Sequence, residues 1–190
     1  MAGKKQFDVD TVLDAAMTQF WRAGYAETSL DDLSAATGLN RSSIYSSLGD
    51  KEALYLRCLD RYATRYGEKY DEALSSASEE PVRAIREFFE VTLDRIADPG
   101  LPDGCLVAQT AMAIPVLSPA IAARAVEAVG FQRARLRTAL GTTKAADDLA
   151  VHLAAVNQSL AVMSRAGASR EQLRAIVDVS LGALSRALSA

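Results

Sequence analysis

The chain has 190 residues, of which 49% are hydrophobic and 24% are charged, and its formal net charge is −3. This length and composition exclude a disordered or collagen-like chain and allow a buried core. The sequence contains no run of about 18 apolar residues, and no apolar segment follows the charged N-terminus, so we expect neither a membrane span nor secretion. The overall negative charge also means that any contact with nucleic acid must come from a local patch.

Metal binding, cofactor binding and catalysis are not expected from the residues present. Cys58 and Cys105 lie far apart and match neither a CxxC metal pair nor a disulfide framework, although a disulfide stays open at this point. His152 is the only histidine, so a His/Cys metal site lacks partners, and we expect this residue to be packed or interfacial. The chain shows no catalytic constellation and no glycine-rich phosphate loop. We therefore predict a cytoplasmic protein without cofactor or metal.

Helical spacing of apolar residues in nearly every segment predicts an all-α fold of about nine helices. The first helix is expected over residues 8–22, with Asp8 as its N-cap and Gly24 beyond its end. Overlapping S/T-x-x-D patterns at residues 28–32 predict a capped second helix of about two turns, which Gly38 ends. A third short helix follows.

The N-caps of the third and fourth helices are Asn40 and Asp50, and the fourth helix is expected to run to about residue 75. Apolar stripes then predict further helices near residues 82–96 and 119–140, with a loop rich in Pro and Gly between them. The last two helices carry apolar residues over 149–163 and 173–188, and the second of them begins with a capping box at Ser169.

The segment over residues 28–54 has the pattern of a helix-turn-helix, because two short helices flank a tight turn at Gly38. At about 100° per residue, Ile44 and Leu48 fall on one face of the third helix, and small polar residues fall on the other. Such a helix can enter the major groove, while nearby helix N-termini can hold phosphates. Residues of this segment suited to DNA contact are Thr28, Ser29, Arg41, Ser42, Tyr45, Ser46 and Lys51.

The stretch AGYAETSLDDLSAATGLNRSSIYSSLGDKEALYL resembles the DNA-binding segment of tetracycline-repressor-like (TetR/AcrR) transcriptional regulators, and the similarity extends from about residue 9 to residue 62. One departure is Leu48, where the family usually has Phe. A weaker resemblance, at residues 103–106, is to a branch of the family with a GC-L motif. The matching residues are Gly24, Tyr25, Thr28, Gly38, Leu39, Tyr45, Lys51 and Leu54.

The resemblance implies a DNA-binding domain over residues 1–52 and a ligand-binding and dimerisation domain over residues 53–190. It adds Ser43 to the residues expected to face DNA. It also implies a homodimer formed through the last two helices, a near-palindromic operator on double-stranded DNA, and a cavity for a small-molecule effector in the C-terminal helices.

Two sets of C-terminal residues are candidates for these roles. Aromatic and Met residues could line a cavity, although aromatic residues at helical spacing more often form plain core. Small residues in the last two helices would allow two subunits to approach closely. The cavity candidates are Tyr62, Tyr66, Phe88, Phe89 and Met112; the small residues are Ala154, Ala155, Ala161, Gly182 and Ala183.

Cys105 follows a glycine-containing loop at a predicted helix N-terminus. A helix N-terminus can lower the pKa of a thiol and make it a redox sensor. The interpretation we prefer is an inert, buried cysteine. The sequence thus predicts a ligand-responsive transcriptional regulator, in the first place a homodimeric repressor released by its effector. The alternative is a helical carrier of small molecules without specific DNA binding, and an all-α enzyme is weaker still.

Overall fold

The computed structural model describes residues 7–189, and these form nine α-helices and one short 3-10 helix, which confirms the predicted all-α class. The first six residues of the predicted 1–52 domain lie outside the described residues. The helices are α1 (Val9–Ala23), α2 (Leu30–Thr37), α3 (Arg41–Leu48), α4 (Lys51–Ala73), α5 (Pro81–Ala97), α6 (Leu106–Met112), α7 (Pro119–Ala139), α8 (Ala146–Arg165) and α9 (Arg170–Leu188), with the 3-10 helix η1 (Ile114–Val116) after α6.

Local sequence sets where the first four helices begin. Each N-cap side chain accepts a hydrogen bond from a backbone N–H in the first turn of its helix, which satisfies a donor that the helix leaves unpaired and contributes about 1 kcal/mol. Gly38 ends α2 with a φ of +71°, a backbone conformation that side chains disfavour, and so turns the chain into α3. The predicted N-caps Asp8, Asn40 and Asp50 are confirmed, and of the two overlapping capping patterns before α2 it is the one beginning at Ser29 that forms.

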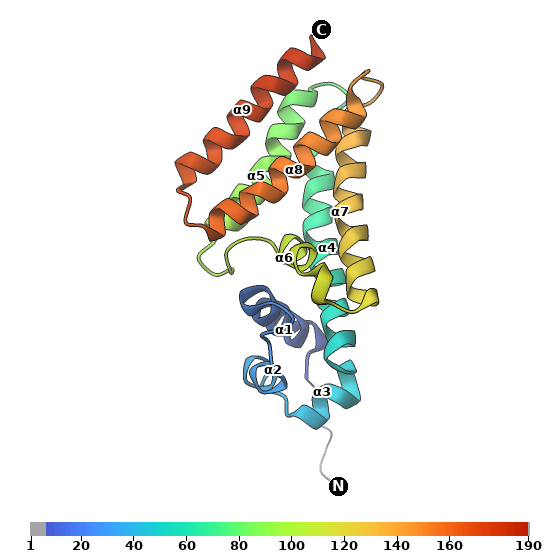
Figure 1. The fold of residues 1–190 in the computed structure, drawn as a ribbon, viewed down its shortest axis with the longest axis vertical. Coiled ribbons are helices and arrows are strands. Elements are labelled where there is room, and N and C mark those ends of the chain that lie inside the picture. Colours follow the sequence, from blue (N-terminus) through green and yellow to red (C-terminus); the bar gives the residue numbers. More distant parts are fainter. Residues whose placement is uncertain (1–6, 190) are drawn as a thin grey trace.

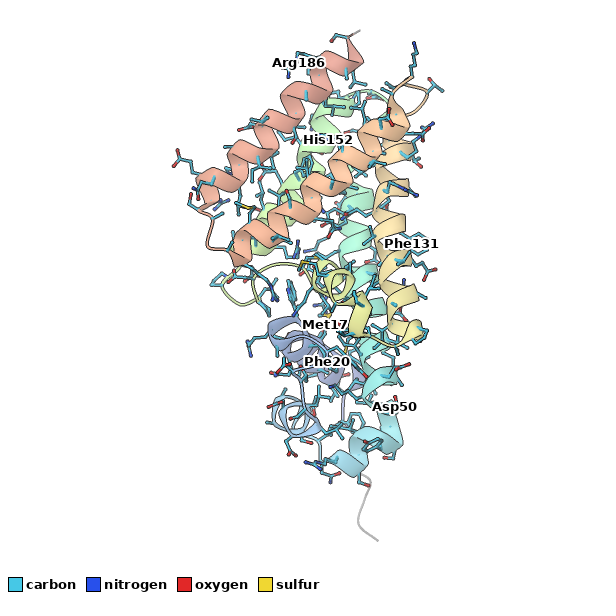
Figure 2. All side chains as sticks on the ribbon, viewed as in Figure 1. Met17, Phe20, Asp50, Phe131, His152 and Arg186 are labelled. Carbon is cyan, nitrogen blue, oxygen red and sulfur yellow. The ribbon has the colours of Figure 1, made fainter. Side chains whose placement is uncertain are left out.

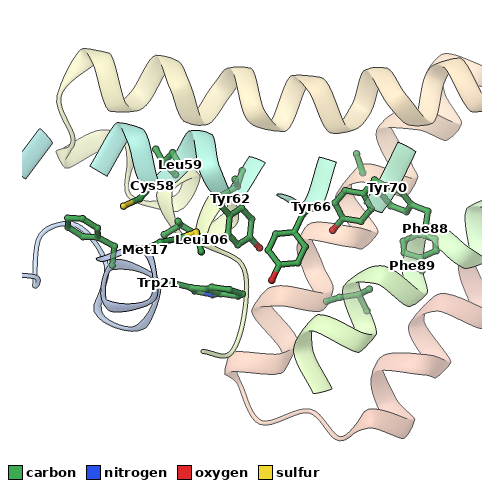
Figure 3. Packing of buried hydrophobic residues seen from close by; sticks show 14 of the residues in the cluster. Met17, Trp21, Cys58, Leu59, Tyr62, Tyr66, Tyr70, Phe88, Phe89 and Leu106 are labelled. Atoms are coloured by element: carbon green, nitrogen blue, oxygen red, sulfur yellow. The ribbon is translucent and has the colours of Figure 1, made fainter. Parts of the chain in front are cut away.

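Helix α4 joins the two ends of the molecule, running from beside α3 into the C-terminal bundle (Figure 1). The predicted division between residues 52 and 53 therefore falls inside a continuous helix. One cluster of buried residues extends from α1 to α9. Within it, the Trp21 and Tyr62 rings pack edge to face, with their centroids 5.1 Å apart (Figure 3). A buried hydrogen bond of 2.7 Å between Tyr55 and Thr110 ties α4 to α6. The helix-turn-helix and the C-terminal bundle thus share one core.

In the C-terminal bundle, α7 packs beside α4, and α8 and α9 form an outer layer next to α5 (Figure 1). Arg124 and Arg135 of α7 pair with Asp60 and Asp71 of α4. Because both partners advance by 11 residues, or about three helical turns, between the two ion pairs, α4 and α7 run parallel. None of the helices in the described part of the chain combines the length and the apolar character needed to cross a membrane.

Candidate functional site

Helix α3 presents one apolar face to the core and one polar face to solvent. Ile44 and Leu48 are buried, as predicted, whereas the Tyr45 ring is 51% exposed. Arg41, Ser42 and Ser46 are also exposed, whereas Ser43 is half-buried, and its backbone N–H donates to the Asn40 side chain in the first turn. The exposed hydroxyls are short, so the backbone of α3 can closely approach a surface placed against it.

The outward placement expected for Thr28 is wrong. Its side chain is fully buried, and its hydroxyl donates a 2.6 Å hydrogen bond to the Gly24 carbonyl oxygen, which closes the turn between α1 and α2. Ser29 is exposed, but its hydroxyl caps α2 and bonds to the Asp32 carboxylate at 2.6 Å. Both hydroxyls are therefore used for local structure, so Thr28 is no longer a candidate for direct contact.

Asp31 was not identified from the sequence, yet it binds the exposed arginine of α3. Arg41 donates two parallel hydrogen bonds to the Asp31 carboxylate, from Nε at 2.9 Å and from Nη2 at 2.5 Å. The hydrogen bonds from Arg41 lower the pKa of Asp31, which keeps this carboxylate ionised at neutral pH. This two-bond geometry is also the one that Arg uses with guanine, so any base contact by Arg41 competes with Asp31.

Lys51, the first residue of α4, lies beside the α3 surface. Its Nζ lies 4.5 Å from the centroid of the Tyr25 ring, a cation–π contact, and burial lowers its pKa. Its ammonium group is therefore held at the N-terminus of a helix, where a phosphate would be stabilised by both the charge and the free N–H groups.

A cavity of about 200 Å³ lies between α4 and α7, with one residue of α8 at its wall. Tyr62 and Tyr66 line it, as the sequence analysis proposed, and Figure 3 shows both rings along α4. The residues that line the cavity are Tyr62, Ala63, Thr64, Tyr66, Gly67, Tyr70, Cys105, Val107, Arg124, Ala128, Phe131, Gln132, Arg135 and Gln158.

Three of the proposed cavity residues lie elsewhere. Phe88 and Phe89 are fully buried on α5, and the Phe88 ring packs on Tyr70 with a centroid distance of 4.5 Å, so they form core instead of cavity wall. Met112 is 62% exposed at the end of α6. Their apolar character alone could not distinguish these environments, because a core position, a cavity wall and an exposed helix end all accept such side chains.

Sequence reasoning missed the polar cavity residues Arg124, Arg135 and Gln158. A signal was present for the two arginines, since the spacing of 11 residues between them matches the spacing between Asp60 and Asp71. Spacing along one helix places charges on one face, but it does not say which other helix that face meets.

The two cysteines are both free. Cys58 is buried, and burial raises its pKa to about 12, so its thiol is inert at neutral pH. Cys105 is half-buried at the cavity, where the Tyr62 hydroxyl donates to its Sγ at 3.3 Å. Within residues 7–189, no three His, Cys, Asp or Glu side chains are grouped so that they could hold a metal ion.

The outer face of α8 and α9 carries apolar side chains that remain open to solvent. Val179 of α9 is 74% exposed and Val151 of α8 is 53% exposed. His152, which follows Val151 on α8, is exposed as well (Figure 2). Ala155, Gly182 and Ala183 are partly or fully open, as expected for an interface, but Ala154 and Ala161 are buried within the subunit, so their assignment to the surface was wrong. Exposed apolar residues clustered on a helix pair are typical of a protein interface.

Comparison with known proteins places both parts of this chain in one group. Residues 12–58 match the family model described as bacterial regulatory proteins, tetR family, and residues 81–175 match the tetracyclin repressor-like C-terminal domain. The HTH-type transcriptional repressor ComR of Escherichia coli K12 is 29% identical over 186 residues, covering 93% of this chain and 89% of ComR. The uncharacterized HTH-type regulator YezE of Bacillus subtilis 168 is 28% identical, covering 97% of this chain and all of YezE.

Solved structures of similar proteins include a DNA complex. A cysteine variant of the TetR family transcriptional regulator CifR, solved with 26-base-pair operator DNA, matches with a TM-score of 0.81 and 29% identity, covering 94% of this chain and 98% of that one. A TetR transcriptional regulator from Chloroflexus aurantiacus matches with the same TM-score and 25% identity, covering 93% of each chain.

Proposed function

The chain belongs to the TetR family and is a ligand-responsive, DNA-binding transcriptional regulator, and on that premise we propose that α3 is its recognition helix. The observation that carries this proposal is the asymmetry of α3, with Ile44 and Leu48 buried and Arg41, Ser42 and Tyr45 exposed. Arg41 and Ser42 would contact base edges in the major groove. Ser43, Ser46, the backbone at Ser29, the Tyr45 hydroxyl and Lys51 would contact the DNA near them and set the register of α3.

We also propose that the protein acts as a homodimeric repressor. The exposed apolar face of α8 and α9 would pack on the same face of a second subunit, which is the arrangement that two-fold symmetry requires. Two recognition helices about 34 Å apart would then read two half-sites of a near-palindromic operator in successive major grooves.

Effector release would act through α4. This helix lines the cavity with Tyr62 and Tyr66, and the residue next to them, Arg61, pairs with Asp14 of α1 at 2.7 Å. A ligand that binds better when α4 is displaced would change the spacing of the recognition helices and lower the affinity for DNA. We propose that the boundary between residues 52 and 53 separates two functions, DNA binding and ligand binding. It does not separate two mechanical units, because α4 runs through it.

Selection on a randomised duplex pool at about 0.15 M salt tests the proposal directly. We expect an inverted repeat to be enriched, and we expect Arg41→Ala to relax the base preference within each half-site. Enrichment of nothing would contradict DNA reading and favour a helical carrier of small molecules. Enrichment of a single, unrepeated half-site would contradict the dimer while leaving the recognition helix in place.

A further inference from the structure

The cavity between α4 and α7 is lined by arginines and not by carboxylates. None of its lining residues is Asp or Glu, although the chain as a whole is acidic, and two of them are arginines. Tyrosine rings form much of the remaining wall. Both arginines are paired with carboxylates that lie outside the lining, so the wall itself combines apolar surface with guanidinium donors and offers no carboxylate oxygen. This combination favours amphipathic ligands that carry a negative group.

Arg135 is positioned to hold such a group. Its Nε donates to Asp71 at 2.7 Å, and this is the only hydrogen bond that its side chain makes within residues 7–189. Its Nη2 lies against Gly67, where even a Cβ would come within 2.7 Å of it. Gly67 lines the cavity, so the unused donors of the guanidinium are at the cavity wall. Arg124 is more fully satisfied, because it bonds to both Asp60 and Glu127.

A second buried charge lies behind the tyrosine wall. Arg95 is only 5% exposed, and it forms no ion pair within the described part of the chain. It donates to the Gly104 carbonyl oxygen, its Nε has no partner, and its guanidinium lies 5.4 Å from the Tyr66 ring and 6.0 Å from the Tyr62 ring. A buried charge without an ion-pair partner is costly, and Arg95 itself lines a second hollow whose wall includes carboxylates of α4 and α5, so its charge lies on the far side of the tyrosine rings from the cavity.

We propose that this cavity binds the effector and that the effector is a small organic anion, a carboxylate with an apolar body and about eight non-hydrogen atoms in all. The size follows from the volume, since a cavity of about 150 Å³ accommodates benzene and this one measures about 200 Å³. The carboxylate pairs with Arg135, and the apolar body lies against Tyr62 and Tyr66. The identification of this ligand as the effector rests on the proposed function, whereas the preference for an anion rests on the cavity alone.

Binding of the anion also provides a route to α4. Asp71, which lies on α4, keeps Nε of Arg135, and a carboxylate on the remaining donors brings a second negative charge to the same guanidinium, which weakens one of the ion pairs that join α4 to α7. Weakening this pair allows α4 to shift relative to α7, which is the movement that effector release requires.

Trp21, the only tryptophan, reports on the site because its ring contacts Tyr62. The experiment titrates the full-length protein with cyclohexanecarboxylate, cyclohexanecarboxamide and cyclohexylmethylammonium, which share one ring and differ in charge, and follows tryptophan fluorescence. We expect the carboxylate to bind at least about tenfold more tightly than the amide, and the ammonium not to saturate the signal. Equal affinity for the amide, preference for the ammonium, or no saturation by the carboxylate at about 10 mM would overturn the proposal.

Two matched arginine variants test whether Arg135 binds the carboxylate. Arg135→Met should weaken carboxylate binding at least about tenfold and change amide binding less than about twofold, because only a charged ligand uses the guanidinium. Arg137→Met on the same helix is the control, since Arg137 pairs with Asp147 outside the cavity, and it should change neither. Equal losses in both variants would overturn the assignment of Arg135.

Operator release is measured separately with the selected duplex. Carboxylate binding that is sensitive to Arg135→Met but leaves operator affinity unchanged would support the anion site and contradict its role as effector site. Release of the operator by the amide alone would overturn the anion proposal while leaving the proposed regulator function intact.

Discussion

Replacing Asp31 by asparagine should strengthen binding to DNA of any sequence and make that binding more sensitive to salt. In the free protein, Asp31 holds Arg41 through two hydrogen bonds of 2.9 and 2.5 Å. DNA binding must release Arg41 from this pair and must bring the Asp31 carboxylate close to phosphates. Asparagine has the same size and keeps an acceptor oxygen, but it removes the negative charge, so both obstacles become smaller.

The size of the effect follows from counting charges. Both partners of the ion pair are well exposed, with 59% and 72% of their side-chain surface accessible, so breaking the pair in water costs little and most of the gain comes from the phosphates. One additional net positive charge at the interface steepens the slope of log affinity against log salt by about 0.9. The advantage of Asp31→Asn over the parent should therefore shrink about 3.5-fold when salt rises from about 0.05 M to about 0.2 M.

Fluorescence anisotropy with the selected duplex and with a scrambled duplex measures this at several salt concentrations. The same substitution in an Arg41→Ala background separates the two causes, because the part of the gain that acts through Arg41 disappears there. Weaker binding of Asp31→Asn to the selected duplex would refute the reasoning, since it would mean that Asp31 orients Arg41 for base contact and does not compete with DNA for it.

Three further results are expected. Lys51→Ala should weaken binding to selected and scrambled duplexes by the same factor and flatten the salt slope by about one, and a loss confined to the selected duplex would contradict a phosphate contact. Val179→Glu should convert the proposed dimer into monomers in sedimentation analysis without lowering the melting temperature, whereas Val126→Glu, also exposed but on α7, should leave that dimer intact. Hydrogen bonding from Arg61 lowers the pKa of Asp14, so this carboxylate stabilises the fold above its ordinary pKa near 3.8, and the contribution is lost as pH falls below that value. In urea unfolding, Asp14→Asn should therefore lower stability at pH 7 and not at pH 2, and an equal loss at both would contradict a charge effect.

Helix α3 shows what could be predicted from local pattern. The caps at Asn40 and Asp50, the glycine turn at Gly38 and the inward face of Ile44 and Leu48 are all set within a few residues, and all were predicted correctly. Thr28 shows the limit of this reasoning, because a hydroxyl near a helix N-terminus can bond either to a ligand or to a neighbouring carbonyl. The sequence alone does not say which of these two partners the hydroxyl bonds to.

The cavity could be predicted only in part. Tyr62 and Tyr66 were placed correctly because they share a face of α4, but Phe88 and Met112 were not, since burial on α5 or exposure at the end of α6 depends on which helices pack against them. Arg135 was missed because nothing along α7 indicates that α4 lies beside it.

The sequence by itself determined the helices, their caps and the polar face of α3, because hydrogen bonds and side-chain periodicity within a helix act over three or four residues. Only the tertiary structure decided that Asp31 holds Arg41, that Arg95 is buried without an ion-pair partner, and that no Asp or Glu side chain lines the cavity. These properties join residues that are as few as ten and as many as 96 positions apart in the chain, from Asp31 with Arg41 to Tyr62 with Gln158. Charge and hydrogen bonding act through space, so they appear only when the packing of the helices is known.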